Sequence, residues 1–161
     1  MPKIREITVR AQDVIPTISA LDPEKLARSL FLYEYDGNPP PICLKEVESG
    51  FYIIDGHHRT AVRRINNDAL AAVVLEHIDE CSLVAPDEGE LDFMLHQFAF
   101  VSAQNLHKLD DRPIDALITP YLVPRVLAEL GLIIAAGDDY TLHCAHRAAV
   151  KMREWFGSLR G

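Results

Sequence analysis

Residues 51–61 read Phe51-Tyr52-Ile53-Ile54-Asp55-Gly56-His57-His58-Arg59-Thr60-Ala61. The apolar run over 51–54 predicts a strand, because it is rich in aromatic and β-branched residues. Gly56 permits a sharp backbone bend, and a helix is predicted directly after it, over about 57–65, closed by two asparagines. The first amides of such a helix have no intrahelical partners and lie at the positive end of its dipole. The stretch therefore predicts an anion-binding turn in an α/β fold.

The side chains around this turn have the chemistry of a phosphate site. Arg59 can fork onto phosphate oxygens, and histidines can donate hydrogen bonds or move protons near neutral pH. Asp55 can hold a magnesium ion or orient a histidine. We assign catalysis to Asp55, His57 and His58, metal binding to Asp55, and phosphate or nucleotide binding to Gly56, His57, His58, Arg59, Thr60 and Arg63, the last lying one helical turn after Arg59.

A plainer interpretation fits the same residues. Asp55 can be only a helix N-cap and Gly56 only a tight turn. The two histidines can be solvated residues of a first turn, and the arginines an exposed polar face. Four polar groups that converge on one helix start favour a site, but both interpretations stay open at this stage.

The flanking sequence predicts a small mixed sheet with a helix before the turn. Strands are predicted over 4–9, 42–44 and 71–75, and Glu48-Ser49-Gly50 makes 42–44 a hairpin partner of 51–54. Asp22 and Pro23 are the N-cap and first residue of a helix whose apolar stripe is Leu26, Ala27 and Leu30. The fold class expected is α/β (α+β).

Residues 85–89 predict a boundary, after which the pattern becomes mainly helical. We divide the chain into a phosphate-binding domain over 1–85 and a helical subdomain over 86–161. Helices are expected over 90–106, 120–130 and 145–156, with a break at 110–113 and Gly131 as a helix stop. Residues 132–143 have the pattern of a short hairpin.

Composition excludes several classes of protein. The chain has 161 residues, of which 48% are hydrophobic and 25% charged, as expected of a folded globular protein. No apolar run is long enough for a bilayer, and the first residues lack the apolar core of a secretory signal. Three well-separated cysteines, Cys43, Cys81 and Cys144, favour reduced thiols and a cytoplasmic location.

The acidic balance argues against coating of a DNA duplex. Residues 1–85 hold 9 basic and 13 acidic residues and 86–161 hold 7 and 11, so each part contributes −4 to a net charge of −8. The stretch over 126–142 also fits the helix and wing of a winged-helix module, a kind of module that reads DNA. Because its helix has only Arg125 as a cation for DNA phosphates, we favour a packing or partner-binding role.

Two further patterns have ordinary interpretations. His77 with Cys81, and His143, Cys144 and His146, include zinc-ligand types, but no CxxC pair exists and the residues are scattered. The apolar cluster at 93–101 is expected to be core, and a homodimer face is the alternative.

The Pro40-Pro41-Ile42 strand start together with the Asp55-Gly56-His57-His58-Arg59 turn resembles the ParB/sulfiredoxin superfamily, specifically its ParB-like nuclease domains, over residues 1 to about 80. Members share a small α/β fold that binds nucleotides or phosphodiesters on this turn. They include partition proteins that hydrolyse CTP, sulfiredoxins that use ATP, free serine kinases that use ADP, nucleases, ATPases and some plasmid fertility-inhibition factors. The resemblance implies that residues 56–59 contact phosphates and that Asp55 assists.

Departures from the family pattern narrow the choice among the members of the superfamily. Sulfiredoxins carry a reactive cysteine where this chain has His57, which excludes that chemistry. Partition proteins have a Gly-Glu-Arg-Arg turn and a basic domain behind it, whereas the rear segment here is acidic. Free serine kinases share the turn most closely but need a catalytic glutamate in the N-terminal segment. Residues 14–19 contain none, and Asp13, Asp22 and Glu24 are out of register.

The leading hypothesis is a nucleotide-dependent enzyme of phosphoryl transfer or phosphodiester hydrolysis, of the NTPase, nuclease or kinase kind, that uses Mg²⁺ with ATP, ADP or CTP. The alternative is a non-catalytic nucleotide-sensing regulator, such as a fertility-inhibition factor, whose C-terminal helices bind a protein partner or a second copy. A DNA-binding ParB-like accessory factor is the third hypothesis. No membrane insertion is expected.

Overall fold

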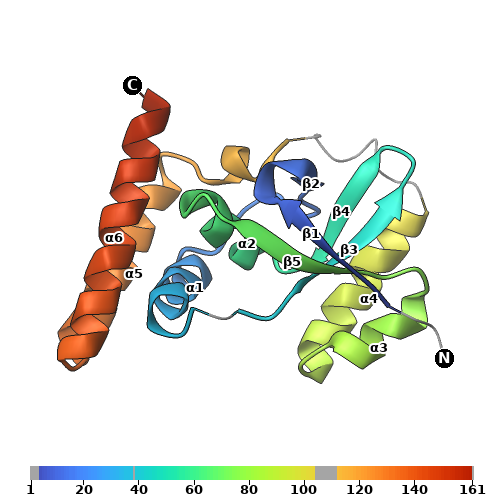
Figure 1. Ribbon diagram of the computed structural model, residues 1–161, viewed down its shortest axis with the longest axis horizontal. Coiled ribbons are helices and arrows are strands. Elements are labelled where there is room, and N and C mark those ends of the chain that lie inside the picture. Colours follow the sequence, from blue (N-terminus) through green and yellow to red (C-terminus); the bar gives the residue numbers. More distant parts are fainter. Residues whose placement is uncertain (1–3, 38, 104–111, 161) are drawn as a thin grey trace.

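The computed structural model describes residues 4–37, 39–103 and 112–160, and its centre is a five-stranded sheet in the order β1-β5-β3-β4-β2 (Figure 1). The strands are β1 (Arg5–Arg10), β2 (Val14–Ile15), β3 (Ile42–Val47), β4 (Gly50–Asp55) and β5 (Ala69–Val74). Neighbouring pairs β1–β5 and β3–β4 are antiparallel, whereas β5–β3 and β4–β2 are parallel. The mixed sheet confirms the α/β fold class, and the predicted hairpin around Ser49 is present.

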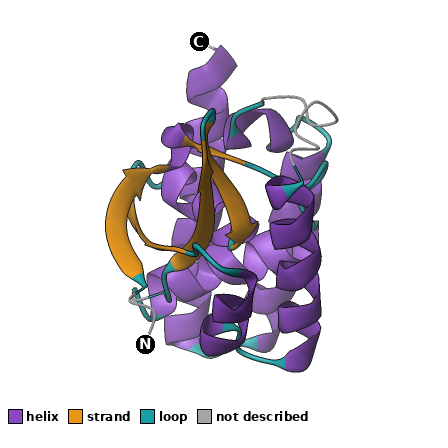
Figure 2. Cartoon of the chain, turned by 90° about the vertical axis from the view of Figure 1, so that its right-hand side faces the viewer, coloured by secondary structure: helices purple, strands orange, loops and turns teal. Residues whose placement is uncertain are grey.

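Helices cover both faces of this layer of strands (Figure 2). α1 (Pro23–Tyr35) and α2 (His57–Ile65) pack on one face, and α5 (Leu122–Ala136) and α6 (Asp139–Arg160) join α1 beyond it. α3 (Cys81–Val84) and α4 (Glu88–Ser102) pack on the other face. Side chains alternate between the two cores along each strand, since Ile53 packs with the first group and its neighbours Tyr52 and Ile54 with the second.

Helix starts near the sheet follow the capping rules. Asp22 accepts a hydrogen bond from the Lys25 amide at 3.0 Å, and Pro23 is the first residue of α1, as predicted. Helix α2 spans His57–Ile65, as predicted. Asp87 caps α4 by accepting from the Glu90 amide at 2.8 Å, so α4 begins two residues before the predicted start. The predicted end of that helix at residue 106 and half of the predicted break, residues 110 and 111, lie outside the described residues.

The predicted hairpin over 132–143 is wrong, and so is the expectation that Gly131 ends a helix. α5 runs through Gly131 to Ala136, because Leu130 is buried on the core side and the glycine lies in open space. α6 starts at Asp139 rather than 145, where Asp138 accepts from the Thr141 amide at 2.8 Å. The Gly137-Asp138 pair therefore connects two helices, and residues 132–143 form no wing.

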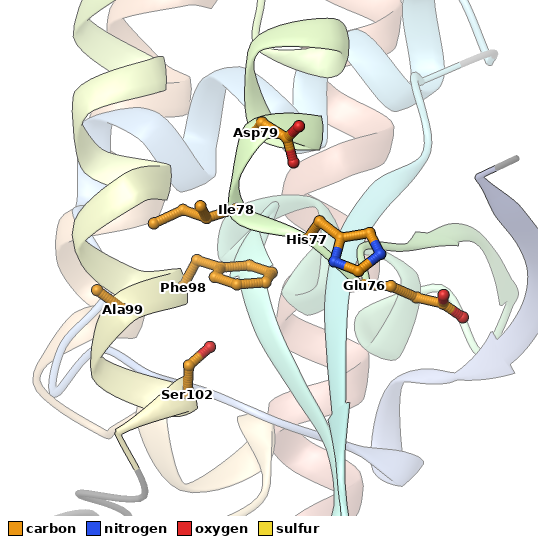
Figure 3. Close-up of a pocket in the computed structure, with 7 residues that line it drawn as sticks. All are labelled: Glu76, His77, Ile78, Asp79, Phe98, Ala99 and Ser102. Atoms are coloured by element: carbon orange, nitrogen blue, oxygen red, sulfur yellow. The ribbon is translucent and has the colours of Figure 1, made fainter. Parts of the chain in front are cut away.

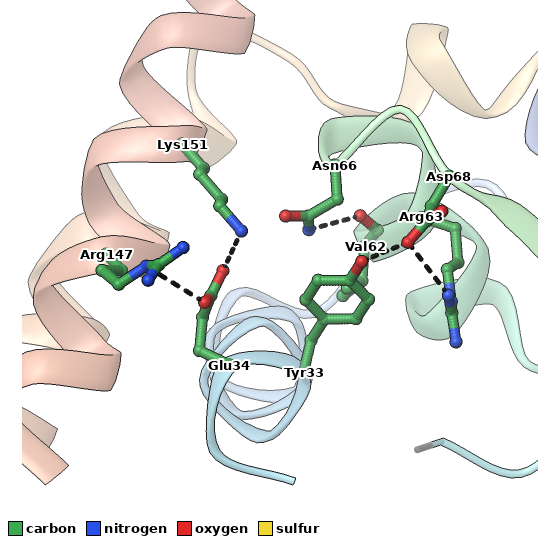
Figure 4. Close-up of polar contacts among 8 residues, drawn as sticks. All are labelled: Tyr33, Glu34, Val62, Arg63, Asn66, Asp68, Arg147 and Lys151. Atoms are coloured by element: carbon green, nitrogen blue, oxygen red, sulfur yellow. Dashed lines mark hydrogen bonds and ion pairs between the residues drawn. The ribbon is translucent and has the colours of Figure 1, made fainter. Parts of the chain in front are cut away.

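Polar contacts hold α6 and α2 to α1 (Figure 4). Glu34, whose side chain is 8% exposed, pairs with Lys151 and with Arg147 at 3.5 Å. The Tyr33 hydroxyl donates to Asp68, which also pairs with Arg63 of α2 at 3.2 Å.

Apolar contacts join the two predicted parts of the chain into one core. Leu26 and Leu30 of α1 belong to the same buried cluster as Leu130 and Met152 of α5 and α6. In the other cluster, Met94 and its helix neighbours Phe98 and Val101 are buried, which confirms the core interpretation of 93–101 in part. Phe93 of the same stretch is exposed. Within the described residues, no helix combines the length and apolarity that a bilayer crossing requires.

Candidate functional site

A cavity of about 780 Å³ lies where the starts of three helices meet. The first turn of α2 and the first two turns of α1 and α4 line it. A loop over 18–20 completes the rim. The side chains that line it with ionisable or imidazole groups are Asp22, Lys25, Arg28, Asp55, His57, His58, Arg59, Asp87 and Glu90. Five consecutive residues predicted for the site, 55–59, thus share one cavity.

Gly56 makes the sharp turn into α2, and no other residue type fits there. Its φ of +105° is in the left-handed region that glycine favours. A Cβ at this position would lie 2.5 Å from Cγ2 of Ile42 and 2.9 Å from an Nη of Arg59. No side chain among the described residues caps α2. The unpaired amides of its first turn are therefore free to bind an anion.

His57 is a buried, neutral hydrogen-bond donor. Its side chain is 3% exposed, and Nε2 accepts from the Thr17 amide at 3.0 Å, which leaves the ring proton on Nδ1. The Thr17 hydroxyl lies 3.1 Å from the same nitrogen and donates to the Ile53 carbonyl. Burial lowers the pKa of His57 to about 3. The residue lines the cavity.

His58 anchors the start of α1. Its Nε2 accepts from the Asp22 amide at 2.9 Å. Burial, and then the charge of Lys25, lower the pKa of His58. Both histidines therefore use a ring lone pair to hold backbone amides of the segment before α1. That use leaves neither Nε2 free to take a proton from a substrate.

Arg59 is held in place by Asp55 and still has N–H donors that can bind a ligand. Its Nη2 lies 3.0 Å from Oδ2 of Asp55, and the two side chains are 24% and 18% exposed. The Nε of Arg59 is buried and has no hydrogen-bond partner among the described residues. A guanidinium has five N–H groups, so an anion in the cavity can bind to Arg59 while the Asp55 pair persists.

Sequence reasoning missed the contributions of α1 and α4. Lys25 and Arg28, one turn apart on the exposed face of α1, add two cations. Glu90 and Phe93 come from α4 in the other predicted domain. The spacing of Lys25 and Arg28 opposite the buried stripe of α1 was a usable signal. Nothing in the sequence places Glu90 next to residue 55, since the contact depends on how α4 crosses the sheet.

Glu90 and Asp55 both line the cavity. Burial, and then the neighbouring charges of Asp55 and Asp87, raise the pKa of Glu90. Lys25 acts in the opposite direction. The cavity therefore combines cations and helix amides on α1 and α2 with a carboxyl group on α4.

Two predicted phosphate ligands lie outside this cavity. Thr60 is fully buried, and its hydroxyl donates to the Gly56 carbonyl at 2.8 Å. Arg63 pairs with Asp68 and lies 5.0 Å from the centre of the Tyr33 ring. It lines a separate cavity of about 280 Å³, which also reaches Arg59.

The acidic residues considered for a serine-kinase site have other partners. Asp13 pairs with Arg10 at 2.9 Å, and Glu24 pairs with Arg28 at 3.0 Å. Asp22 lines the cavity but caps α1, and the Lys25 amide lowers its pKa. Among the described residues, no three His, Cys, Asp or Glu side chains are gathered so that they could hold a metal ion. Cys43, Cys81 and Cys144 are all buried free thiols.

A second hollow, of about 600 Å³, lies between the segment after β5 and the C-terminal part of α4 (Figure 3). Its ionisable side chains, Glu76, His77 and Asp79, are exposed, and Phe98 forms its apolar wall. No cation and no buried polar side chain line it among the described residues. It therefore lacks the convergent groups that distinguish the cavity at α2.

Comparison with protein-family models and with curated proteins finds no match to this chain. The resemblance to the ParB/sulfiredoxin superfamily therefore stays a prediction that rests on the Asp55–Arg59 turn.

Proposed function

We propose that this protein binds the phosphate chain of a nucleotide in the cavity at α2 and catalyses hydrolysis or transfer of the terminal phosphoryl group. The observation that supports this most is the Nε of Arg59, a buried donor without a hydrogen-bond partner among the described residues, beside the uncapped amides of α2. Buried donors normally have partners. Phosphate oxygens would supply the missing acceptors.

The charges of the cavity support the same assignment. Arg59 can bind two phosphate oxygens while Asp55 holds its other edge, and Lys25 and Arg28 lie on the adjoining wall. A cavity of about 780 Å³ is of the size that takes small-molecule ligands. The net charge of −8 favours a small anion drawn to a local cationic patch over a long DNA duplex.

Magnesium enters this proposal only as the ion that accompanies the nucleotide phosphates. The described residues offer no ready set of metal ligands, and Asp55 is engaged by Arg59. The protein's own residues bind and orient the phosphates, and they stabilise the charge that develops on the transferred group.

The first test is binding of ATP, ADP and CTP, each with and without Mg²⁺, by calorimetry and by thermal shift. Arg59→Ala removes hydrogen bonds to a charged group, which contribute about 1.5–3 kcal/mol, and should weaken binding about 10- to 150-fold. Arg153→Ala removes an exposed arginine of α6 outside the cavity and is the matched control.

Phosphate release measured on the same proteins separates the hypotheses. Binding with release supports the enzyme, whereas binding without release supports the nucleotide-sensing regulator. Equal affinity in the two arginine variants, or no binding of any of the three nucleotides, would reject the cavity as a nucleotide site.

A further inference from the structure

A phosphoryl-transfer site needs a group that accepts the proton of the attacking hydroxyl, and the two histidines do not fit that role. The Nε2 atoms of His57 and His58 already accept the amides of Thr17 and Asp22. The remaining ring nitrogens carry protons, so each imidazole can donate to the cavity but not accept. A general base must therefore come from another side chain.

Glu90 has the required position. It lies on the first turn of α4 and lines the same cavity as Asp55, whose charge acts on it. Asp55 itself is held by Arg59, and Asp22 and Asp87 cap helices by accepting from backbone amides. Glu90 is thus the one cavity carboxylate, among the described residues, that has neither a cap nor an ion pair to maintain.

Solvent can reach this carboxyl group. Asp87 and Gly89 beside it are exposed, and Glu90 is only partly buried. The first turn of α2, with its uncapped amides, lines the same cavity, where the phosphates would sit. A water next to Glu90 would therefore lie in the same cavity as the bound phosphate chain.

We propose that Glu90 is the general base that activates water for attack on the terminal phosphorus of a nucleoside triphosphate, an inference that rests on the proposed function. The Glu90 carboxylate takes one proton of the water as the water oxygen bonds to phosphorus. The bridging P–O bond breaks, and its electron pair leaves with the nucleoside diphosphate. Glu90 then releases its proton to solvent. The raised pKa of Glu90 makes the carboxylate a stronger base than an exposed one.

The test compares Glu90→Gln with Glu88→Gln. Glu88 is an exposed residue of the same helical turn that does not line the cavity, and its variant removes the same charge from α4. For each protein, the affinity for ATP and CTP is measured by calorimetry and turnover by phosphate release. Glu90→Gln should keep wild-type affinity or bind more tightly, since a negative charge is lost near the phosphates. Its turnover should fall by about 100-fold or more.

Glu88→Gln should match the wild type in both measurements. Glu90→Asp keeps a carboxylate and should retain more turnover than Glu90→Gln, which a merely structural role would not require. Wild-type turnover in Glu90→Gln overturns the assignment while the nucleotide site stands. Binding without turnover in the wild type overturns it too. Absence of nucleotide binding in the wild type overturns the proposed function and this assignment together.

Discussion

Replacing Gly56 with alanine should destabilise the protein and displace Arg59 at the same time. The new Cβ would lie 2.5 Å from Cγ2 and 2.8 Å from Cβ of Ile42, which is fully buried in β3. It would also lie 2.9 Å from an Nη of Arg59. Because Ile42 is part of the sheet, the turn itself must move to relieve the contact.

The size of the effect follows from the backbone and from packing. A residue other than glycine at positive φ costs about 1–2 kcal/mol, and overfilling a packed core costs about 1–3 kcal/mol. The lower entropy of the unfolded alanine chain offsets about 0.4–1 kcal/mol. We therefore expect a loss of about 1–4.5 kcal/mol in the free energy of unfolding, out of a total of about 5–15 kcal/mol for a domain.

Urea unfolding followed by circular dichroism measures this loss, with Gly131→Ala as the matched control. Gly131 lies inside α5 with nothing within 4 Å of a new Cβ, so the same substitution should stabilise the protein by about 0.5–1 kcal/mol. If Gly56→Ala unfolds at the wild-type urea concentration and keeps the Arg59-dependent nucleotide affinity, the description of the turn is wrong.

Two further predictions concern His57 and the core shared with the C-terminal helices. Unfolded His57 takes up a proton below about pH 6.5, whereas folded His57 resists protonation down to about pH 3, so the free energy of unfolding should fall as the pH drops through this range, by at most about 1.4 kcal/mol per pH unit. His57→Gln keeps an acceptor for the Thr17 amide and should flatten this slope in urea titrations between about pH 6.5 and 5. An equal slope in both proteins would contradict the burial of the ring. Leu130→Ala should lower the free energy of unfolding by about 2–5 kcal/mol in a single transition, because Leu130 is fully buried in the core that α5 shares with α1. A loss below about 1 kcal/mol, or a separate transition for the C-terminal helices, would refute that packing.

Local sequence patterns predicted the elements around the turn well. Asp22 and Pro23 marked the start of α1, and the Gly56 turn marked the start of α2, because caps and positive φ depend on a few adjacent residues. The hairpin over 132–143 was predicted wrongly because Gly131 has the pattern of a helix stop. In the structure, burial of Leu130 and its neighbours against α1 outweighs the modest helix cost of one glycine.

For the candidate site too, the sequence predicted one part correctly and missed another. The cluster at 55–59 was found from the sequence because its members are consecutive, but the roles of its members were not. Packing buried His57 and directed both histidines to backbone amides, and it turned Thr60 into the core. None of these orientations is encoded within the turn itself.

The sequence by itself determined where a strand turns into a helix with unpaired amides, since that depends on short-range sterics and backbone hydrogen bonding. Only the tertiary structure decided which distant groups meet those amides. Lys25 lies on α1 and Glu90 on α4. These two helices are held by the burial of their apolar faces on opposite sides of the sheet. Such burial is non-directional and sums over many residues, so no local pattern in the chain specifies it.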